Sequence, residues 1–469
     1  MFKNKLLILL RQLPIEDLKD YLNYLKKMYP KKGVAIKLME YIKDSAPAFE
    51  EKRLDRKRAF AKLFKGETFK NSKINNTISD LRLHLKEFLL IQYMERFEYQ
   101  RNYMLLRIYR RVRAKDHFYR LLDQMEDKLN AGPQEDVWHW FKKMQLAHER
   151  YYYPSAARRG QEAEKILDAM KGLDQFYTIA KLRYSCELYN RHKVLGEELP
   201  TIQFVDQIKA LDPTSVTPLF NCYRLSLQLF QKPLDTTYFQ LKECFIQYRA
   251  SFCLQDQWVL SNYLINYSGV AFKKGNHQFS RETFELLQLC DQYGLFSVDE
   301  ELHSGQFINA VYVATALKEF DWAEQFIDRW EANLRPKERD NTLKMCRGVI
   351  AFRKGNFSES LMQLRELEFT SPYLKIRSKW LQLCVFYELK EGTDFILHQS
   401  TNFEQFIRRN EQNQQIGTRI AQSVLTSIRL LRKLLQPTPS KTQLLEEIAE
   451  ANPIHNKKWL LQKINELAD

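Results

Sequence analysis

Apolar residues recur along this chain at the three- and four-residue spacing that places side chains on one face of an α-helix. A first stripe covers 15–28 and is closed by Pro30, and similar stripes follow over 33–42 and 52–64. Turn residues are scarce: 14 Gly and 14 Pro among 469 residues lie well below the usual shares of about 7% and 5%. Because a sheet protein needs turns roughly every 8–12 positions, the pattern predicts an all-α fold.

A long helical pattern follows over 71–130, with Asn71 and Ser72 as the expected N-caps. It contains no Gly or Pro and is too long for one ordinary helix, so we expect breaks near 97–102 or 115–116. The first strong cluster of helix-breaking residues is Ala-Gly-Pro at 131–133, which predicts the end of an N-terminal helical module over 1–130.

The clearest repeat-like unit covers 341–372. Gly348 and Ser360 are small enough to let two helices approach closely, Gly355 is suited to end the first helix, and Pro372 to end the unit. Large apolar residues fall at the intervening offsets: Phe357, Leu364 and Leu367. The unit resembles a tetratricopeptide repeat, a helical hairpin of about 34 residues.

Three looser units surround it, carried by Trp380, Leu383, Cys384 and Tyr387, by Phe320, Ala323 and Ile327, and by Ala271, Gly275, Ser280 and Phe284. The resemblance spans roughly 256–400, and it implies an α-solenoid of stacked hairpins over 134–436. A helix over 412–435, a capping box from Ser440 to Gln443 and a last helix over 457–467 indicate C-terminal capping helices in 440–469.

The positive charge is confined to one part of the chain. The formal net charge is +15, and residues 1–120 contain 29 Lys and Arg against 14 Asp and Glu, whereas residues 121–469 contain 44 of each. The N-terminal module is therefore the basic part of the protein. A basic surface is suited to an acidic protein surface or to nucleic-acid phosphates.

Ten basic residues of this module are the candidate contacts for nucleic acid or an acidic partner: Arg53, Arg56, Lys57, Arg58, Lys70, Lys73, Arg107, Arg110, Arg111 and Arg113. Helix, Gly66-containing turn and helix give the outline of a helix-turn-helix. This arrangement is similar to bacterial regulators that join a DNA-binding domain to tetratricopeptide-like repeats, with 79–82 (Ser-Asp-Leu-Arg) near their recognition-helix pattern. A basic protein-docking face, or a solvated one, is the alternative interpretation.

Motifs for catalysis, metals and cofactors are missing from the sequence. There is no phosphate-binding loop, dinucleotide fingerprint, nucleophile elbow or zinc-protease helix, and nine histidines are dispersed. Arg111 and His117 have a spacing found in some all-helical ribonucleases, but four arginines crowd that stretch and make it easily accidental. We therefore expect no enzyme activity, cofactor or metal.

Aromatic residues and cysteines fit a packed helical interior. Trp138, Trp140 and the run 151–154 (Tyr-Tyr-Tyr-Pro) could stack bases, but aromatics at helical spacing more often pack between helices. The seven cysteines form no C-x-x-C pair and suggest a reducing cytoplasm. The apolar run 6–10 is too short for a signal peptide, and no stretch is long enough to span a membrane.

These observations predict a non-enzymatic scaffold or adaptor whose repeat groove binds a protein or peptide partner. The alternative is a regulator that binds nucleic acid through residues 1–120 and uses its repeats to sense a partner.

Overall fold

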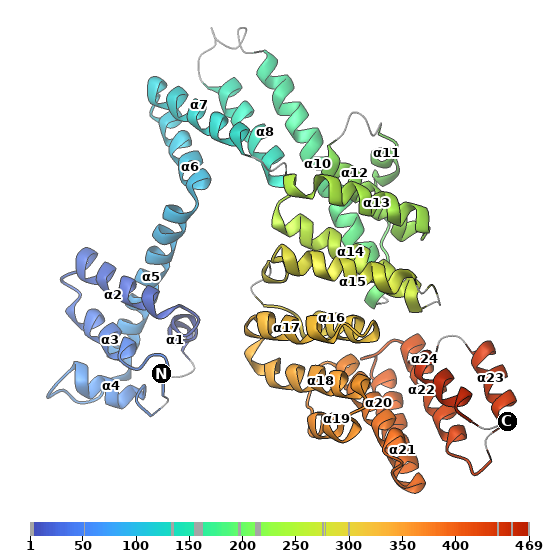
Figure 1. The fold of residues 1–469 in the computed structure, drawn as a ribbon. Helices are drawn as coiled ribbons and strands as arrows, with labels where there is room; N and C mark the ends of the chain where they lie inside the picture. The colour runs from blue at the N-terminus through green and yellow to red at the C-terminus, as the bar shows by residue number, and fades with distance from the viewer. Residues whose placement is uncertain are drawn as a thin grey trace. The chain divides into compact units, whose positions relative to one another are not determined.

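The computed structural model describes residues 4–50, 52–132, 136–153, 163–195, 198–211, 217–273, 276, 278–298, 301–438, 440–451 and 454–467 (Figure 1). Over these residues the all-α fold is confirmed: helices follow one another without a strand, and one isolated bridge pairs Leu302 with Leu334. The chain forms two compact units, Met1–Ala131 with His148–Lys165, and Gly132–Ala147 with Ile166–Asp469.

The first unit is built around one apolar core. Its helices are α1 (Lys5–Leu10), α2 (Ile15–Met28), α3 (Gly33–Lys43), α4 (Arg56–Leu63), α5 (Asn71–Arg96), α6 (Glu98–Arg111) and α7 (Lys115–Ala131). The apolar stripes of α1 to α5 meet in this core. Tyr21 of α2 is buried there, and its hydroxyl donates to the carbonyl of Leu81 at 2.5 Å. The core therefore fixes α2 against α5.

The long pattern over 71–130 breaks at Phe97, within the expected range, and again at 112–114, just before the expected 115–116. Phe97 ends α5 and caps α6, and Arg113, with a φ of 58°, lies in the turn before α7. The expected N-caps of α5 are wrong by a residue. Lys70 holds the N-cap position, because Asn71 already belongs to the first turn, where its side-chain oxygen accepts from Arg56.

The second unit contains most of the remaining helices; α8 (Val137–Tyr152) is divided between the units. The others are α10 (Glu164–Leu195), α11 (Val205–Lys209), α12 (Pro218–Gln231), α13 (Asp235–Tyr248), α14 (Leu254–Lys273), α15 (Gln278–Gln292), α16 (Ser304–Ala316), α17 (Phe320–Trp330), α18 (Pro336–Lys354), α19 (Phe357–Leu364), α20 (Pro372–Glu388), α21 (Thr393–Gln412), α22 (Thr418–Leu434), α23 (Lys441–Glu450) and α24 (Lys457–Asn465). From α12–α13 to α20–α21 they pack as consecutive neighbouring pairs, an arrangement compatible with a helical repeat.

The pair α18–α19 has the local features that its sequence predicts. A Cβ added at Gly348 would lie 2.9 Å from Leu364, so the small residue lets the helices approach closely. The Ser360 hydroxyl, which is buried, donates to the Gly348 carbonyl at 2.8 Å. Gly355 ends α18 with a φ of +83°, which favours glycine. Pro372 is the first residue of α20, so it begins the next pair.

The looser units lie on the expected helices. Trp380, Leu383 and Cys384 are buried on α20, and Ala323 is buried on α17. At the C-terminal end, α22 begins at Thr418 rather than near 412, because Gln412 ends α21 and a turn intervenes. Ser440 caps α23 by accepting from the Gln443 amide at 3.3 Å, as expected.

Several residues that were predicted to end helices or form turns lie outside the described residues: Pro133, Pro154, Gly275, Pro439, Asn452 and Pro453. Within the described part of the chain, no helix combines the length and the apolar character that crossing a membrane requires.

Candidate functional site

The first group of predicted basic residues lies around α4 and the start of α5. Lys73 is paired with Glu67 at 2.6 Å and lies 4.6 Å from the centre of the Phe64 ring. Arg56 donates to Asn71 at 3.2 Å, and Arg58 donates to the Lys52 carbonyl at 3.1 Å. Three of the cations are exposed and have neither an ion pair nor a side-chain hydrogen bond within the described residues: Arg53, Lys57 and Lys70.

Asp55 organises this group by capping α4. Its carboxylate accepts from the backbone amides of Lys57 and Arg58 at 2.9 and 3.1 Å. The Arg58 amide, with that of Lys57, holds the pKa of the Asp55 carboxyl below its usual value. The Asp55 carboxylate is therefore already hydrogen-bonded by backbone amides of its own helix.

The second group lies on α6 and the turn after it. Arg110 reaches the buried Glu149 carboxylate at 2.8 Å, whereas Arg107, Arg111 and Arg113 are exposed. Helix α5, with 26 residues and therefore a length of about 39 Å, separates the two groups along the chain. His117 is exposed, and its ring lies 5.5 Å from that of Tyr109.

The aromatic run near 151–153 packs against neighbouring rings. Tyr153 is buried, with its ring centre 4.3 Å from that of Phe118, and the ring centre of Tyr152 lies 4.5 Å from that of His148 in a tilted arrangement. Trp140 is buried as well. Trp140 and Tyr153 are therefore used for packing, whereas Trp138 and Tyr152 are exposed.

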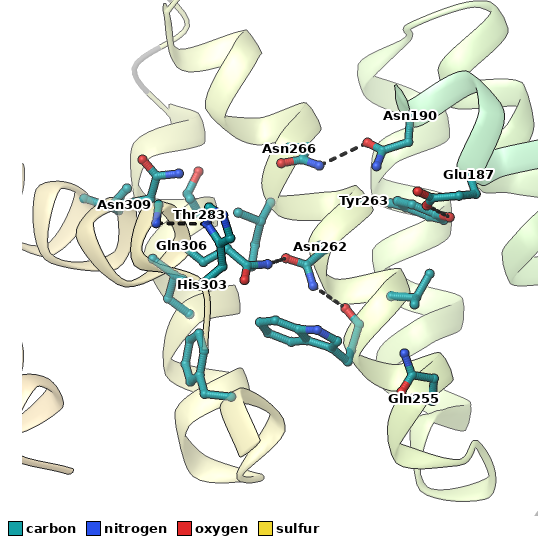
Figure 2. A pocket seen from close by; sticks show the side chains of 17 residues that line it. Glu187, Asn190, Gln255, Asn262, Tyr263, Asn266, Thr283, His303, Gln306 and Asn309 are labelled. Atoms are coloured by element: carbon teal, nitrogen blue, oxygen red, sulfur yellow. Dashed lines mark hydrogen bonds between the residues drawn. The ribbon is translucent and has the colours of Figure 1, made fainter. Parts of the chain in front are cut away.

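The second unit contains a cavity of about 530 Å³ between α10, α14, α15 and α16 (Figure 2). Its apolar lining comes mainly from Trp258, Tyr263, Leu287 and Phe296. The polar lining consists mainly of amides, with one carboxylate, one hydroxyl and one imidazole: Glu187, Asn190, Gln255, Asn262, Asn266, Thr283, His303, Gln306 and Asn309. We call this site the amide cavity.

Helical spacing aligns these polar groups in pairs. Glu187 and Asn190 are three residues apart on α10, Asn262 and Asn266 are four apart on α14, and Gln306 and Asn309 are three apart on α16. Residues at these spacings share one face of a helix. Each of the three helices therefore turns two polar side chains toward the same space (Figure 2).

Hydrogen bonds between helices connect the amides into a series. Asn266 of α14 donates to Asn190 of α10 at 3.1 Å, and Gln306 of α16 donates to Asn262 of α14 at 3.1 Å. Asn262 also donates to its own helix, to the Trp258 carbonyl at 2.8 Å. Asn266 and Gln306 use their amino groups in these bonds, and Asn190 uses its oxygen. The Asn190 amino group and the Asn266 and Gln306 side-chain oxygens have no hydrogen bond within the described residues.

The series continues to α20. Arg377 donates to the Asn309 side-chain oxygen at 2.7 Å, and its guanidinium carbon lies 4.4 Å from the centre of the Tyr312 ring. No carboxylate pairs with Arg377 in the part of the chain that the structure describes. The amide cavity is thus bordered by Glu187 on α10 and by Arg377 on α20.

A buried polar cluster fixes α10 against α14 beside the cavity. Asp256 is fully buried, lies 3.3 Å from the Arg183 guanidinium and accepts from the Tyr223 hydroxyl. The Cys253 thiol also donates to it, at 3.2 Å. Burial first, and then the charge of Asp256, raises the pKa of Cys253 to about 12. The cluster holds the two helices whose amides face each other.

Among the described residues no group of three or more His, Cys, Asp and Glu is placed to hold a metal ion. Primary amides neither gain nor lose protons near neutral pH, so the side chains that dominate the cavity can donate and accept hydrogen bonds but cannot act as acids or bases. Two titratable side chains, Glu187 and His303, line the cavity beside these amides.

One feature of the sequence marks this site, although it carries no charge and matches no known motif. In 261–267 (Ser-Asn-Tyr-Leu-Ile-Asn-Tyr) two amides four residues apart interrupt an otherwise apolar helix. A search for protein families, for curated relatives and for similar solved structures found no match to the chain.

Proposed function

We propose that this chain is a non-enzymatic binding protein whose amide cavity holds an extended segment of a polypeptide partner. The observation that carries the proposal is the set of facing amides on α10, α14 and α16, with unused donors and acceptors directed at one space. An extended peptide offers the same two groups, N–H and C=O, at every residue. Side-chain amides are therefore suited to its main chain rather than to one particular side chain.

The size and the mixed lining of the cavity support this proposal. A volume of about 530 Å³ falls within the roughly 300–1,000 Å³ that is typical of ligand sites. Trp258 and Phe296 supply apolar surface beside the amides, which suits alternate apolar side chains of a bound strand. The neutral amides favour binding over chemical conversion.

The charges at the two borders suggest a polarity for the ligand. Glu187 is exposed at the α10 border, where it accepts a long hydrogen bond of 3.4 Å from Tyr263. Arg377 is half-buried at the α20 border and has only a neutral amide and an aromatic ring as partners. A segment with a basic residue near α10 and an acidic residue near α20 matches this charge distribution best.

The helix pairs supply the scaffold for such a site. We infer that the pairs from α12–α13 to α20–α21 form a divergent tetratricopeptide-like array, supported by the Gly348–Leu364 approach, the Gly355 cap and Pro372. In such an array, successive helices present one continuous binding surface.

The proposal is tested with random peptides displayed on phage and selected against the full-length chain. Selected peptides are then synthesised and their affinities measured by fluorescence polarisation. Asn262→Ala and Asn266→Ala should each weaken binding by roughly fivefold to thirtyfold, because each removes a hydrogen-bonding group worth about 1–2 kcal/mol. The matched control is Gln288→Ala, an exposed amide on α15 outside the cavity lining.

The control should bind like the wild-type chain, and circular dichroism should show the same helix content in all variants. The proposal is contradicted if selection yields no saturable binder. It is equally contradicted if the two α14 variants bind every selected peptide as tightly as the control does.

Nucleic-acid binding by the N-terminal module is the second candidate. The observation that favours it is the exposure of Arg53, Lys57 and Lys70 without ion pairs among the described residues. Lys73 and Arg110, by contrast, already have carboxylate partners. Binding of the full chain to duplex DNA or RNA should then fall steeply with salt concentration, and no binding at low salt would exclude it.

A further inference from the structure

Two thiols lie in contact between the helices of one pair. The sulfurs of Cys222 on α12 and Cys244 on α13 are 3.3 Å apart, and Cys222 is completely buried while Cys244 is 9% exposed. The remaining five cysteines are free thiols, and within the described residues none of them is bonded to a second cysteine. The proximity of the pair follows from the fold, because α12 and α13 are consecutive packed helices.

The surroundings of the pair treat its two sulfurs differently. Cys244 accepts from the Cys222 thiol and, at 3.8 Å, from the side-chain amino group of Asn221. Arg224 in turn donates to the Asn221 oxygen at 2.7 Å, which orients that amide toward the sulfur. The Cys222 thiol, then Asn221 and the charge of Arg224, lower the pKa of Cys244, whereas the same Cys222–Cys244 bond and burial raise the pKa of Cys222.

This asymmetry matches the division of labour in thiol oxidation. The thiolate, rather than the thiol, is the nucleophile, and hydrogen-bond donors and a nearby cation stabilise it. A second thiol in contact can then resolve the oxidised sulfur. Cys244 is suited to the first role and Cys222 to the second.

We propose that Cys244 and Cys222 form a redox site that reacts with hydroperoxides and closes a disulfide between α12 and α13. The Cys244 thiolate attacks the peroxide ROOH; the O–O bond breaks, Cys244 becomes a sulfenic acid, and the alkoxide leaves and takes up a proton as ROH. The Cys222 thiol then attacks the Cys244 sulfur, the S–S bond forms, and the hydroxyl leaves with the Cys222 proton as water. Two thiols are oxidised and one peroxide is reduced.

The fold can accommodate this bond with little movement. The sulfurs need to approach by only about 1.3 Å to reach the usual bond length of about 2.05 Å. The two cysteines are 22 residues apart in the chain, on either side of the turn that joins the helices. The disulfide would therefore staple a pair that is already packed, and it would resist separation of α12 from α13.

The experiment uses the native full-length chain and its own cysteines as internal controls. The protein is treated with one equivalent of hydrogen peroxide, its free thiols are alkylated with N-ethylmaleimide after denaturation, and the peptides are mapped by mass spectrometry. We expect a linked peptide joining Cys222 to Cys244. The solitary buried thiols Cys290, Cys346 and Cys384 should be recovered alkylated and unoxidised.

Two variants separate the roles of the sulfurs. In Cys222→Ala the oxidised Cys244 should persist as a sulfenic acid that dimedone traps, and in Cys244→Ala neither product should form. The proposal is overturned if the wild-type chain yields no linked peptide. It is also overturned if the three solitary thiols oxidise as readily as the pair, because contact between the sulfurs would then confer nothing.

Discussion

The basic residues of the N-terminal module and the amide cavity of the second unit differ in how their polar side chains are used. In the module, most of the candidate charges belong to exposed side chains; Lys73 pairs with the exposed Glu67, whereas the half-buried Arg110 pairs with the buried Glu149. In the cavity, neutral amides bind one another across helices, and each still has hydrogen-bonding capacity toward a space that is partly open to solvent. The candidate contacts of the first region are identified by their charge. Those of the second region are identified by the way their side chains face one another.

The difference follows from what each kind of group gains from a partner. Exposed charges are well solvated, so their pairs contribute little and their positions are loosely specified. Polar groups in a partly enclosed site lose water and need partners, so their arrangement specifies a ligand. Matched substitutions in the two regions test this difference.

The largest difference in the loss of unfolding free energy is expected between a buried ion pair beside the cavity and an exposed ion pair in the N-terminal module. Asp256→Ala leaves the half-buried Arg183 without its carboxylate, so the second unit should lose about 3–5 kcal/mol of unfolding free energy. Glu67→Ala removes only the exposed partner of Lys73 and should cost about 0–1 kcal/mol. Urea unfolding followed by circular dichroism measures both, and equal losses would contradict the comparison.

Acid should destabilise the second unit through one buried histidine. His139 is buried, its Nε2 has no partner within the described residues, and burial, followed by the charges of Lys143 and Lys142, lowers its pKa from 6.5 to about 4. Because the unfolded chain takes up the proton first, this stability is complete above about pH 6.5 and is lost as the pH falls toward 4.

The loss should approach about 3 kcal/mol across that window. In His139→Phe the stability of the second unit should depend less on pH over the same range. The exposed His117 on α7 provides the control, since His117→Phe should leave the pH dependence of the second unit unchanged. Identical pH profiles for the wild-type chain and His139→Phe would rule this explanation out.

Two glycines test whether the close approach of helices is specific to the pair α18–α19. Gly348→Ala places its Cβ 2.9 Å from Leu364 and should destabilise the fold by about 1–3 kcal/mol. Gly269→Ala on α14 meets open space and should instead stabilise the helix by up to about 1 kcal/mol. Thermal unfolding midpoints should therefore shift in opposite directions, and a shift in the same direction would undermine the close approach.

The smallest effect is expected from the basic module. Replacing Arg53, Lys57 and Lys70 together by Gln should leave the affinity for selected peptides unchanged, because these exposed charges contribute nothing to the cavity. If the module binds nucleic acid, the same variant should reduce the log–log salt slope by about 0.9 for each lost phosphate contact. A loss of peptide affinity in this variant would place the binding surface in the basic module.

Much of the fold could be predicted from the sequence, because helical periodicity and turn chemistry are local. The stripe of α2, the break at Phe97 and the Gly355 cap are all determined by residues near one another in the chain. The observed N-cap of α5 lies one position before the predicted one, because the Asn71 side chain accepts from Arg56 instead of capping the helix.

The amide cavity could not be predicted in the same way, because its partners come from distant helices. Asn190 and Asn266 are 76 residues apart, and Asn309 and Arg377 are 68 apart. The spacing of Asn262 and Asn266 marks a polar face on an apolar helix, but the packing of α10 on α14 decides what that face contacts. The contact between Cys222 and Cys244 is likewise produced by the pairing of α12 with α13.

Side-chain amide NMR can show whether the cavity amides bind a peptide main chain. With ¹⁵N-labelled Asn and Gln, the NH₂ signals of Asn190 and Asn309 can be followed while a selected peptide is titrated into the full-length chain. We predict that both signals shift saturably and become protected from solvent exchange, while the signal of Gln288 stays fixed. Saturating peptide that leaves Asn190 and Asn309 unchanged would contradict the account.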